Sequence, residues 1–410
     1  MTNTLRPHGH QRTPLPPAQE AASQDSRPRP ADAAPGRGSP TPEAGNRKPK
    51  KRDPFFDNAK YLAIVLVACG HAWEPLTDHS RAAEALYMVV YAFHMPAFII
   101  VSGYFSRSFD MRPDRLQRLI TGVVVPYVLF ETAYSLFKRV ADDDPGHPVS
   151  LLDPWYLTWF LIALFAWRIT TPIWQVVRWP VPLALAVAVL ASVSPDIGDD
   201  LDLQRVLQFL PFFVVGLCMK PEHFQLFRRR EVRMLSVPLF ACAVVFAYWA
   251  APRMASAWFY HRDSVQELAA PWWSGPVMTL ALFGCSMLLS CAFFAWVPRR
   301  QMWFTVLGAG TLYGYLLHGF LAKGSRFWDW YEVSWVETPW GAIVVTFLAA
   351  ALITVLCTPP VQRMFRFAME PKMTWAFRKD AAELAPGRAK PGAGQGGRTA
   401  GSPGARESGG

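Results

Sequence analysis

The first long apolar segment of the sequence contains the ionisable side chains Asp57, Lys60 and His71. If the segment is helical, the eleven residues from Lys60 to His71 make three turns plus about 20°, so both side chains project from one face. Asp57 lies near the same face, and the axial distance from Lys60 to His71 is about 16 Å. Because an imidazole can exchange a proton near neutral pH, His71 is a candidate for taking or giving a proton.

Two interpretations of His71 stay open at this stage. An ionisable group inside an apolar segment costs free energy, which favours a functional role. The alternative is a structural histidine that is hydrogen-bonded to a neighbouring helix. Glu74, three residues later, either orients the imidazole or is a solvated carboxylate at the helix end.

The next apolar segment contains His94 and Pro96, and it ends with Ser102 and Tyr104. The proline predicts a kink whose freed carbonyl must be satisfied by neighbouring helices. A second histidine in an apolar segment is again a candidate for the site.

Arg115 and Arg118 follow in a basic stretch, three residues apart at the start of the third apolar segment. Arginines in this arrangement can form bidentate contacts with a phosphate. The competing interpretation is ordinary positive charge at a membrane surface, or binding of lipid headgroups.

Later apolar segments contain three more candidates. His318 is expected near the outer end of its segment. Arg205 contacts an acidic or sugar substrate, or simply pairs with Asp202 three residues earlier. Glu131 is either a buried protonated acid or a partner for a histidine.

These side chains must be positioned by membrane-spanning helices, since the 410 residues are 51% hydrophobic and only 18% charged. A spanning helix needs about 20 mainly apolar residues. The sequence predicts an all-α polytopic membrane protein with about ten transmembrane helices. The expected spans are 57–76, 85–105, 118–137, 155–174, 180–195, 203–219, 234–251, 275–297, 303–322 and 340–358.

The distribution of charge predicts the orientation. Lys and Arg are concentrated before the first span, after the last and in the loops that follow even-numbered spans, so both termini are expected in the cytoplasm. The same rule accounts for the net charge of +10 without a nucleic-acid partner. Residues 1–52 and 380–410 lack aromatic side chains and are expected to be disordered tails, which leaves 53–379 as the membrane domain.

The six cysteines lie within apolar runs and show no CxxC or Cys/His spacing, so neither a disulfide framework nor a metal site is expected. The sequence also lacks the phosphate-binding loop, nucleophile elbow and zinc-protease motifs of soluble enzymes.

Together these residues resemble the acyltransferase-3 family of membrane acyltransferases, and most closely its fucose 4-O-acetylase-like branch. The first-span pattern of a basic residue, ten residues and a histidine is met by Lys60 and His71 after Asp57. The segments HMPAF at 94–98 and SGY at 102–104 are similar to the family's HMPLF and SGY signature, with Ala97 where leucine is usual. The resemblance covers residues 53–362 and includes Arg115, Arg118 and the segment 307–318.

The resemblance implies that an acyl group, by default acetyl and alternatively succinyl, moves from cytoplasmic acyl-coenzyme A (acetyl-CoA by default) to a hydroxyl. The acceptor would be a glycan, a lipid-linked sugar or a metabolite, and the site would lie in the plasma membrane. His71 would be the catalytic residue, as general base or transient acyl carrier, with Asp57, His94, His318, Glu131 and Arg205 in the supporting pocket. Lys60, also in the pocket, would join Arg115 and Arg118 in neutralising the donor's phosphates. Ser102 and Tyr104 would bind the donor together with the two arginines.

Two other functions compete with the enzyme. A proton-coupled secondary transporter could use intramembrane His, Lys and Glu side chains as a relay. A membrane scaffold could use the same polar groups only to hold helices together.

Overall fold

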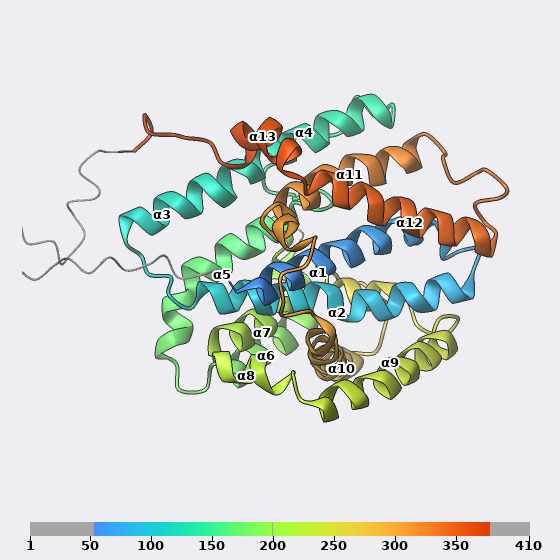
Figure 1. Cartoon of the computed structure of the whole chain (residues 1–410), viewed down its shortest axis with the longest axis horizontal. Coiled ribbons are helices and arrows are strands. Elements are labelled where there is room, and N and C mark those ends of the chain that lie inside the picture. The colour runs from blue at the N-terminus through green and yellow to red at the C-terminus, as the bar shows by residue number, and fades with distance from the viewer. Residues whose placement is uncertain (1–52, 199, 378–410) are drawn as a thin grey trace, which may run out of the picture. The chain divides into compact units, whose positions relative to one another are not determined.

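The computed structural model describes residues 53–198 and 200–377, and within these ranges the regular structure is helical. The tails predicted for 1–52 and 380–410 lie outside the described residues. Figure 1 shows α1 and α2 side by side at the centre, with α9 and α10 on one side and α11 and α12 on the other. The longer helices are α1 (Pro54–Trp73), α2 (Arg81–Ser106), α4 (Val125–Ala141), α5 (Trp159–Val176), α6 (Pro180–Ser192), α7 (Leu203–Cys218), α9 (Arg230–Ala250), α10 (Ser274–Trp296), α11 (Thr311–Phe327), α12 (Pro339–Leu356) and α13 (Pro359–Met369).

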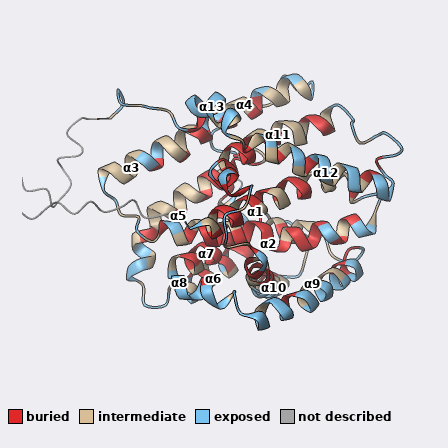
Figure 2. Ribbon diagram, in the orientation of Figure 1, coloured by how far each residue is buried: buried red, intermediate tan, exposed pale blue. Residues whose placement is uncertain are grey.

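Each of the ten expected spans overlaps a helix, but in the described part of the chain six helical stretches are both long and apolar enough to cross a membrane. The short helix α3 (Pro113–Leu119) joins α4 through a π-helical turn, Ile120–Val124, to make one of these six. An all-helical membrane protein is therefore confirmed, whereas the count of ten and the location of the termini stay predictions. Most of the apolar stretches of α9 and α12 are not buried, as a lipid-facing surface requires (Figure 2).

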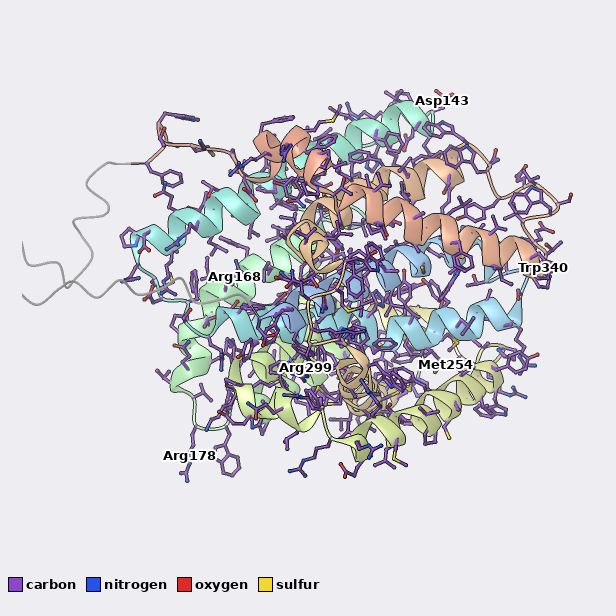
Figure 3. The ribbon with its side chains drawn as sticks, in the orientation of Figure 1. Asp143, Arg168, Arg178, Met254, Arg299 and Trp340 are labelled. Carbon is purple, nitrogen blue, oxygen red and sulfur yellow. The ribbon has the colours of Figure 1, made fainter. Side chains whose placement is uncertain are left out.

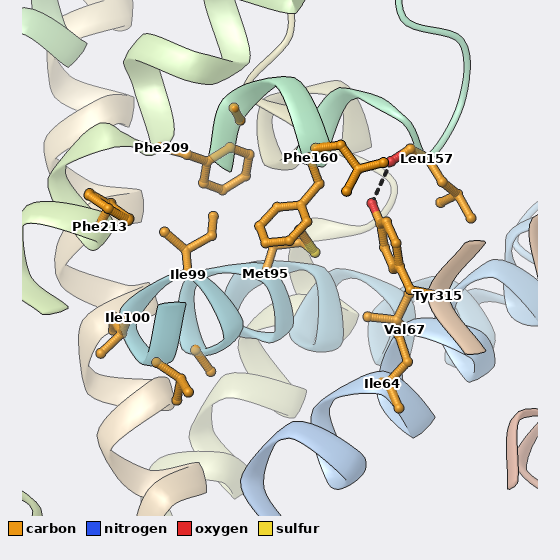
Figure 4. Packing of buried hydrophobic residues seen from close by; sticks show 14 of the residues in the cluster. Ile64, Val67, Met95, Ile99, Ile100, Leu157, Phe160, Phe209, Phe213 and Tyr315 are labelled. Atoms are coloured by element: carbon orange, nitrogen blue, oxygen red, sulfur yellow. Dashed lines mark hydrogen bonds between the residues drawn. The ribbon is translucent and has the colours of Figure 1, made fainter. Parts of the chain in front are cut away.

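The core forms where α1, α2, α5, α7 and α11 meet. Figure 4 shows Met95 and Ile99 of α2 among Phe160, Phe209 and other apolar side chains. The side chain of Tyr315 extends across this cluster, and its hydroxyl donates to the carbonyl oxygen of Leu157 at 2.7 Å. The cluster packs the middle of α1 against the segment before α5, which fixes the side chains near His71.

Two glycines allow α2 and α7 to touch backbone to backbone. A Cβ at Gly103 would collide with the carbonyl oxygen of Phe213, and one at Gly216 would collide with that of Ile100. The glycine of the SGY segment is therefore needed for close helix packing.

The beginning of α1 is attached to the segment that precedes α11. The buried amide of Asn58 donates to the carbonyl oxygens of Pro298 (2.8 Å) and Arg300 (3.1 Å), and its oxygen accepts from the Thr305 hydroxyl at 2.6 Å. A Cβ at Gly308 would collide with the backbone of Asp57. These contacts hold the short 3-10 helix η6, Thr305–Ala309, against α1.

Because residues 305–309 are used in this contact, α11 begins at Thr311 and not near residue 303. His318 consequently lies in the middle of α11, and the expected position near the end of a span was wrong. The same shift brings Lys323 and Arg326 into the last turns of α11, although both were expected in a loop.

Figure 3 places Arg168 and Arg178 toward one end of the bundle, and Asp143 and Trp340 toward the other. His71 is near the C-terminal end of α1, which points away from the arginine end.

Candidate active site

His71 is surrounded by polar and aromatic side chains. Its Nδ1 lies 3.2 Å from the hydroxyl of Tyr91 and 3.7 Å from Oε2 of Glu74, and the side chain is 13% exposed. The contact with Tyr91 is a hydrogen bond, whereas the distance to Glu74 is too long for one and makes it an electrostatic partner. Both neighbours are on the Nδ1 side, which leaves Nε2 as the nitrogen for a substrate.

Glu74 is more than a solvated carboxylate at a helix end. It lies in the short 3-10 helix Glu74–Leu76, and its Oε1 accepts from Arg326 of α11 at 2.9 Å. The carboxylate thus connects the end of α1 to α11 while its second oxygen faces His71.

His318 lies beside His71, with their ring centroids 5.6 Å apart. Its Nδ1 lies 3.0 Å from the carbonyl oxygen of Gly314, which can only accept, so Nδ1 carries a proton. Its Nε2 is buried and has no hydrogen-bond partner among the described residues. An unpartnered buried nitrogen beside the candidate base is unusual and suits contact with a ligand.

His94 is in a second layer of the site. It is buried, and its Nδ1 donates to the carbonyl oxygen of Val90 at 2.7 Å. Its ring packs edge-on against Tyr91 at 4.8 Å, and Tyr91 in turn reaches His71. The histidine therefore supports the tyrosine that touches the candidate base.

A tyrosine on a loop covers another side of His71. The ring of Tyr156 lies 5.0 Å from the His71 ring, and its backbone has φ +59°. This left-handed conformation is strained for a residue with a large side chain, and such strain concentrates at functional sites. The ammonium group of Lys323 lies 4.5 Å from the Tyr156 ring centroid.

Glu131 holds this loop in place. The backbone N–H of Trp155 (2.9 Å) and the hydroxyl of Thr158 donate to one of its carboxylate oxygens, and Ser135 donates to the other at 3.4 Å. Glu131 acts on the site through the segment that carries Tyr156. A partnership with a histidine, one of the two expectations, is not among these contacts.

The remaining candidates from the first two helices lie toward the N-terminus of α1. Lys60 forms an ion pair of 2.8 Å with Asp57. Ser102 donates within α2 to the carbonyl oxygen of Phe98. Tyr104 stacks on Phe56 and lines a cavity of about 290 Å³ that also includes Arg228 and Arg299.

Arg115 and Arg118 line a separate cavity of about 380 Å³, together with Arg168 of α5. Arg118 pairs with Asp114 at 2.6 Å and its side chain is 73% exposed, while Arg115 pairs with Asp110 at 3.3 Å. The three guanidinium groups make this cavity suitable for an anion, and His71 is not among its lining residues.

Arg205 pairs with Asp202 at 3.2 Å, donates to the carbonyl oxygen of Tyr260 and lies over the Trp159 ring. The ion pair, one of the two expectations for this residue, is therefore present.

Four of the residues near His71 were not predicted as site residues: Tyr91, Tyr156, Lys323 and Arg326. Tyr91 precedes His94 by three residues, so helical spacing could have placed it beside the candidates. Lys323 and Arg326 could have been found only by locating the start of α11. The position of Tyr156 depends on a loop conformation that has no sequence signature.

A family model described as an acyltransferase domain matches residues 53–358, which is most of the chain. No curated protein and no solved structure matches. The matched range includes every residue named around His71. The chain belongs to the acyltransferase-3 family and is an acyltransferase.

Proposed function

We propose that the protein transfers an acyl group from acyl-coenzyme A to a hydroxyl of a carbohydrate or related acceptor in the plasma membrane. The acceptor class comprises glycans, lipid-linked sugars and hydroxylated metabolites, and acetyl is the group that the fucose 4-O-acetylase-like branch would use. The observation that carries the proposal is the position of His71, with Tyr91 and Glu74 on its Nδ1 side and His318 beside it.

In the proposed reaction, the oxygen of the acceptor hydroxyl attacks the thioester carbonyl carbon while Nε2 of His71 takes the hydroxyl proton. The carbon–sulfur bond then breaks, and the departing thiolate takes the proton from the imidazolium. In the alternative order, His71 is acylated first and the acceptor hydroxyl then attacks the acyl-histidine. Positioning and proton transfer supply much of the acceleration for a reactive thioester.

The surroundings of His71 support a hydroxylated acceptor. Tyr156 and Trp155 offer aromatic faces, and Lys323, Arg326 and Glu74 offer charged hydrogen-bonding groups. The arginine-lined cavity at Arg115 and Arg118 supports binding of the donor's phosphates, and Lys60, paired with Asp57, is a further cation on the helix that carries His71. No metal is needed for either step.

The test compares a deletion strain complemented with wild type, His71→Ala or His79→Ala. His79 is an exposed histidine paired with Glu337 and serves as the matched control. Mass spectrometry of surface glycans and metabolites should show that His71→Ala loses an acyl mass that wild type and His79→Ala restore, at equal amounts of protein in the membrane. Full restoration by His71→Ala would reject the proposed role.

A further inference from the structure

An apolar cavity of about 430 Å³ lies beside His318, between α1, α11, α12 and the segment 330–336. Small side chains form its inner wall, including Ala68 and Ala72 of α1 and Ala349 of α12. Leu348 and Trp335 line its outer part and are 61% and 48% exposed, so the cavity extends to the lipid-facing surface.

The cavity is next to the candidate base. Ala72 follows His71 directly, and Ala68 lies one turn before it on α1. His318 lines the cavity, its ring is 5.6 Å from that of His71, and its buried Nε2 has no partner among the described residues. A ligand that fills the cavity therefore lies beside this nitrogen, on the histidine whose ring neighbours that of His71.

The two surroundings of this histidine pair differ in chemistry. Around His71 lie Tyr156, Lys323 and the pair of Glu74 with Arg326, which suit a hydroxylated acceptor. The cavity beside His318 is lined mainly by aliphatic and aromatic side chains. In the proposed reaction, two unlike groups meet at the thioester carbonyl carbon. One is the attacking hydroxyl of the acceptor, and the other is the acyl chain of the donor.

We propose that this cavity receives the acyl chain of the donor, and that the enzyme prefers apolar acyl groups longer than acetyl. The inference rests on the proposed function and refines its donor. The carbonyl carbon lies at His71, Nε2 of His318 can accept a hydrogen bond from a hydroxyl of the acceptor, and the chain extends between α11 and α12. An acetyl group supplies one methyl and leaves most of the 430 Å³ empty.

The size of the preference follows from burial of methylene groups. Each buried methylene strengthens binding by about 4-fold. Hexanoyl-CoA carries four methylenes more than acetyl-CoA, so on the order of 100-fold tighter binding is the upper expectation for a fully enclosed chain. Because the cavity is open toward the lipid, at least a 10-fold difference is expected.

The test uses the purified full chain and measures the midpoint of thermal unfolding against the concentration of CoA, acetyl-CoA, butyryl-CoA and hexanoyl-CoA. Ala322→Leu fills the cavity from α11, one turn after His318 and on the same face. Ala351→Leu is the matched control, since Ala351 is an exposed residue of α12 that does not line the cavity.

Wild type and Ala351→Leu should bind hexanoyl-CoA at least 10-fold more tightly than acetyl-CoA, and Ala322→Leu should lose this difference while its affinity for acetyl-CoA is kept. Equal affinity of wild type for the two esters would overturn the inference and leave the proposed function standing. Unchanged hexanoyl preference in Ala322→Leu would place the chain elsewhere, in lipid or detergent, and would also overturn it. Failure of every ester to stabilise the protein would reject the donor and the proposed function together.

Discussion

Glu74 and Arg326 form an ion pair of 2.9 Å that closes the end of α1 onto α11, and the second carboxylate oxygen of Glu74 faces Nδ1 of His71 at 3.7 Å. One carboxylate therefore has two functions, a structural one toward the arginine and an electrostatic one toward the imidazole. In the proposed reaction, a negative charge at this position would stabilise the imidazolium that forms when His71 takes a proton.

The first prediction separates these two functions. Glu74→Gln should lower the turnover number about 10- to 100-fold, because it removes the charge facing His71, and should change donor KM little. Arg326→Gln leaves the carboxylate in place and should reduce turnover less. Steady-state kinetics of CoA release measure both effects. A larger loss in Arg326→Gln than in Glu74→Gln would contradict the electrostatic role.

The second prediction concerns Tyr91, whose hydroxyl lies 3.2 Å from Nδ1 of His71. Tyr91→Phe keeps the ring that packs on His94 but removes the hydrogen bond that orients the imidazole. Turnover should fall about 5-fold with little change in KM, since one neutral hydrogen bond contributes about 1 kcal/mol.

Tyr87→Phe is the matched control for this change. Its ring stacks on Tyr91, and its hydroxyl is hydrogen-bonded to Tyr260 and not to His71. Turnover in this control should stay within about 2-fold of wild type. Equal losses in the two variants would show that packing, and not the orientation of His71, is responsible.

The sequence was sufficient to predict an all-helical membrane protein, because helical periodicity and long apolar runs depend on local residue patterns. The same local patterns were sufficient to predict that Lys60 and His71 lie on one helix, which is α1. The position of α11 could not be predicted, since it depends on the packing of Gly308 against the backbone of Asp57. That packing decides that Arg326 and Lys323 reach the site.

The conformation of Tyr156 was equally inaccessible from the sequence. Its positive φ and its position over His71 depend on hydrogen bonds from Trp155 and Thr158 to Glu131, which lies on a different helix. Glu131 was recognised as unusual because of its cost in an apolar segment. Its role in fixing a loop appears only when the tertiary contacts are known.

The third prediction tests the contact between α2 and α7. Gly103→Ala places a Cβ against the backbone of Phe213, and because two helix backbones cannot move apart cheaply, the midpoint of thermal unfolding should fall by several degrees. Gly284→Ala is the control, since a Cβ there meets no atom within 4 Å and alanine is the better helix former. The control should be neutral or slightly stabilising, and destabilisation of both to the same degree would rule out the packing explanation.

The last prediction concerns the arginine-lined cavity. Arg115→Ala combined with Arg118→Ala removes two of its three guanidinium groups, and Arg168 is left. Donor affinity should fall at least 10-fold, because each lost charged hydrogen bond to a phosphate costs about 1.5–3 kcal/mol. Acceptor affinity should stay within 2-fold.

Arg178→Ala gives the matched control, since Arg178 lies toward the same end of the bundle but does not line this cavity. The Kd for CoA, measured at two salt concentrations, distinguishes a specific phosphate site from general positive charge at the membrane surface. A specific site predicts that only the double variant weakens binding. The opposing result is that Arg178→Ala weakens CoA binding as much as the double variant at low salt, and that neither variant weakens it at high salt. In that case the arginines act through the surface potential, and the phosphate site is rejected.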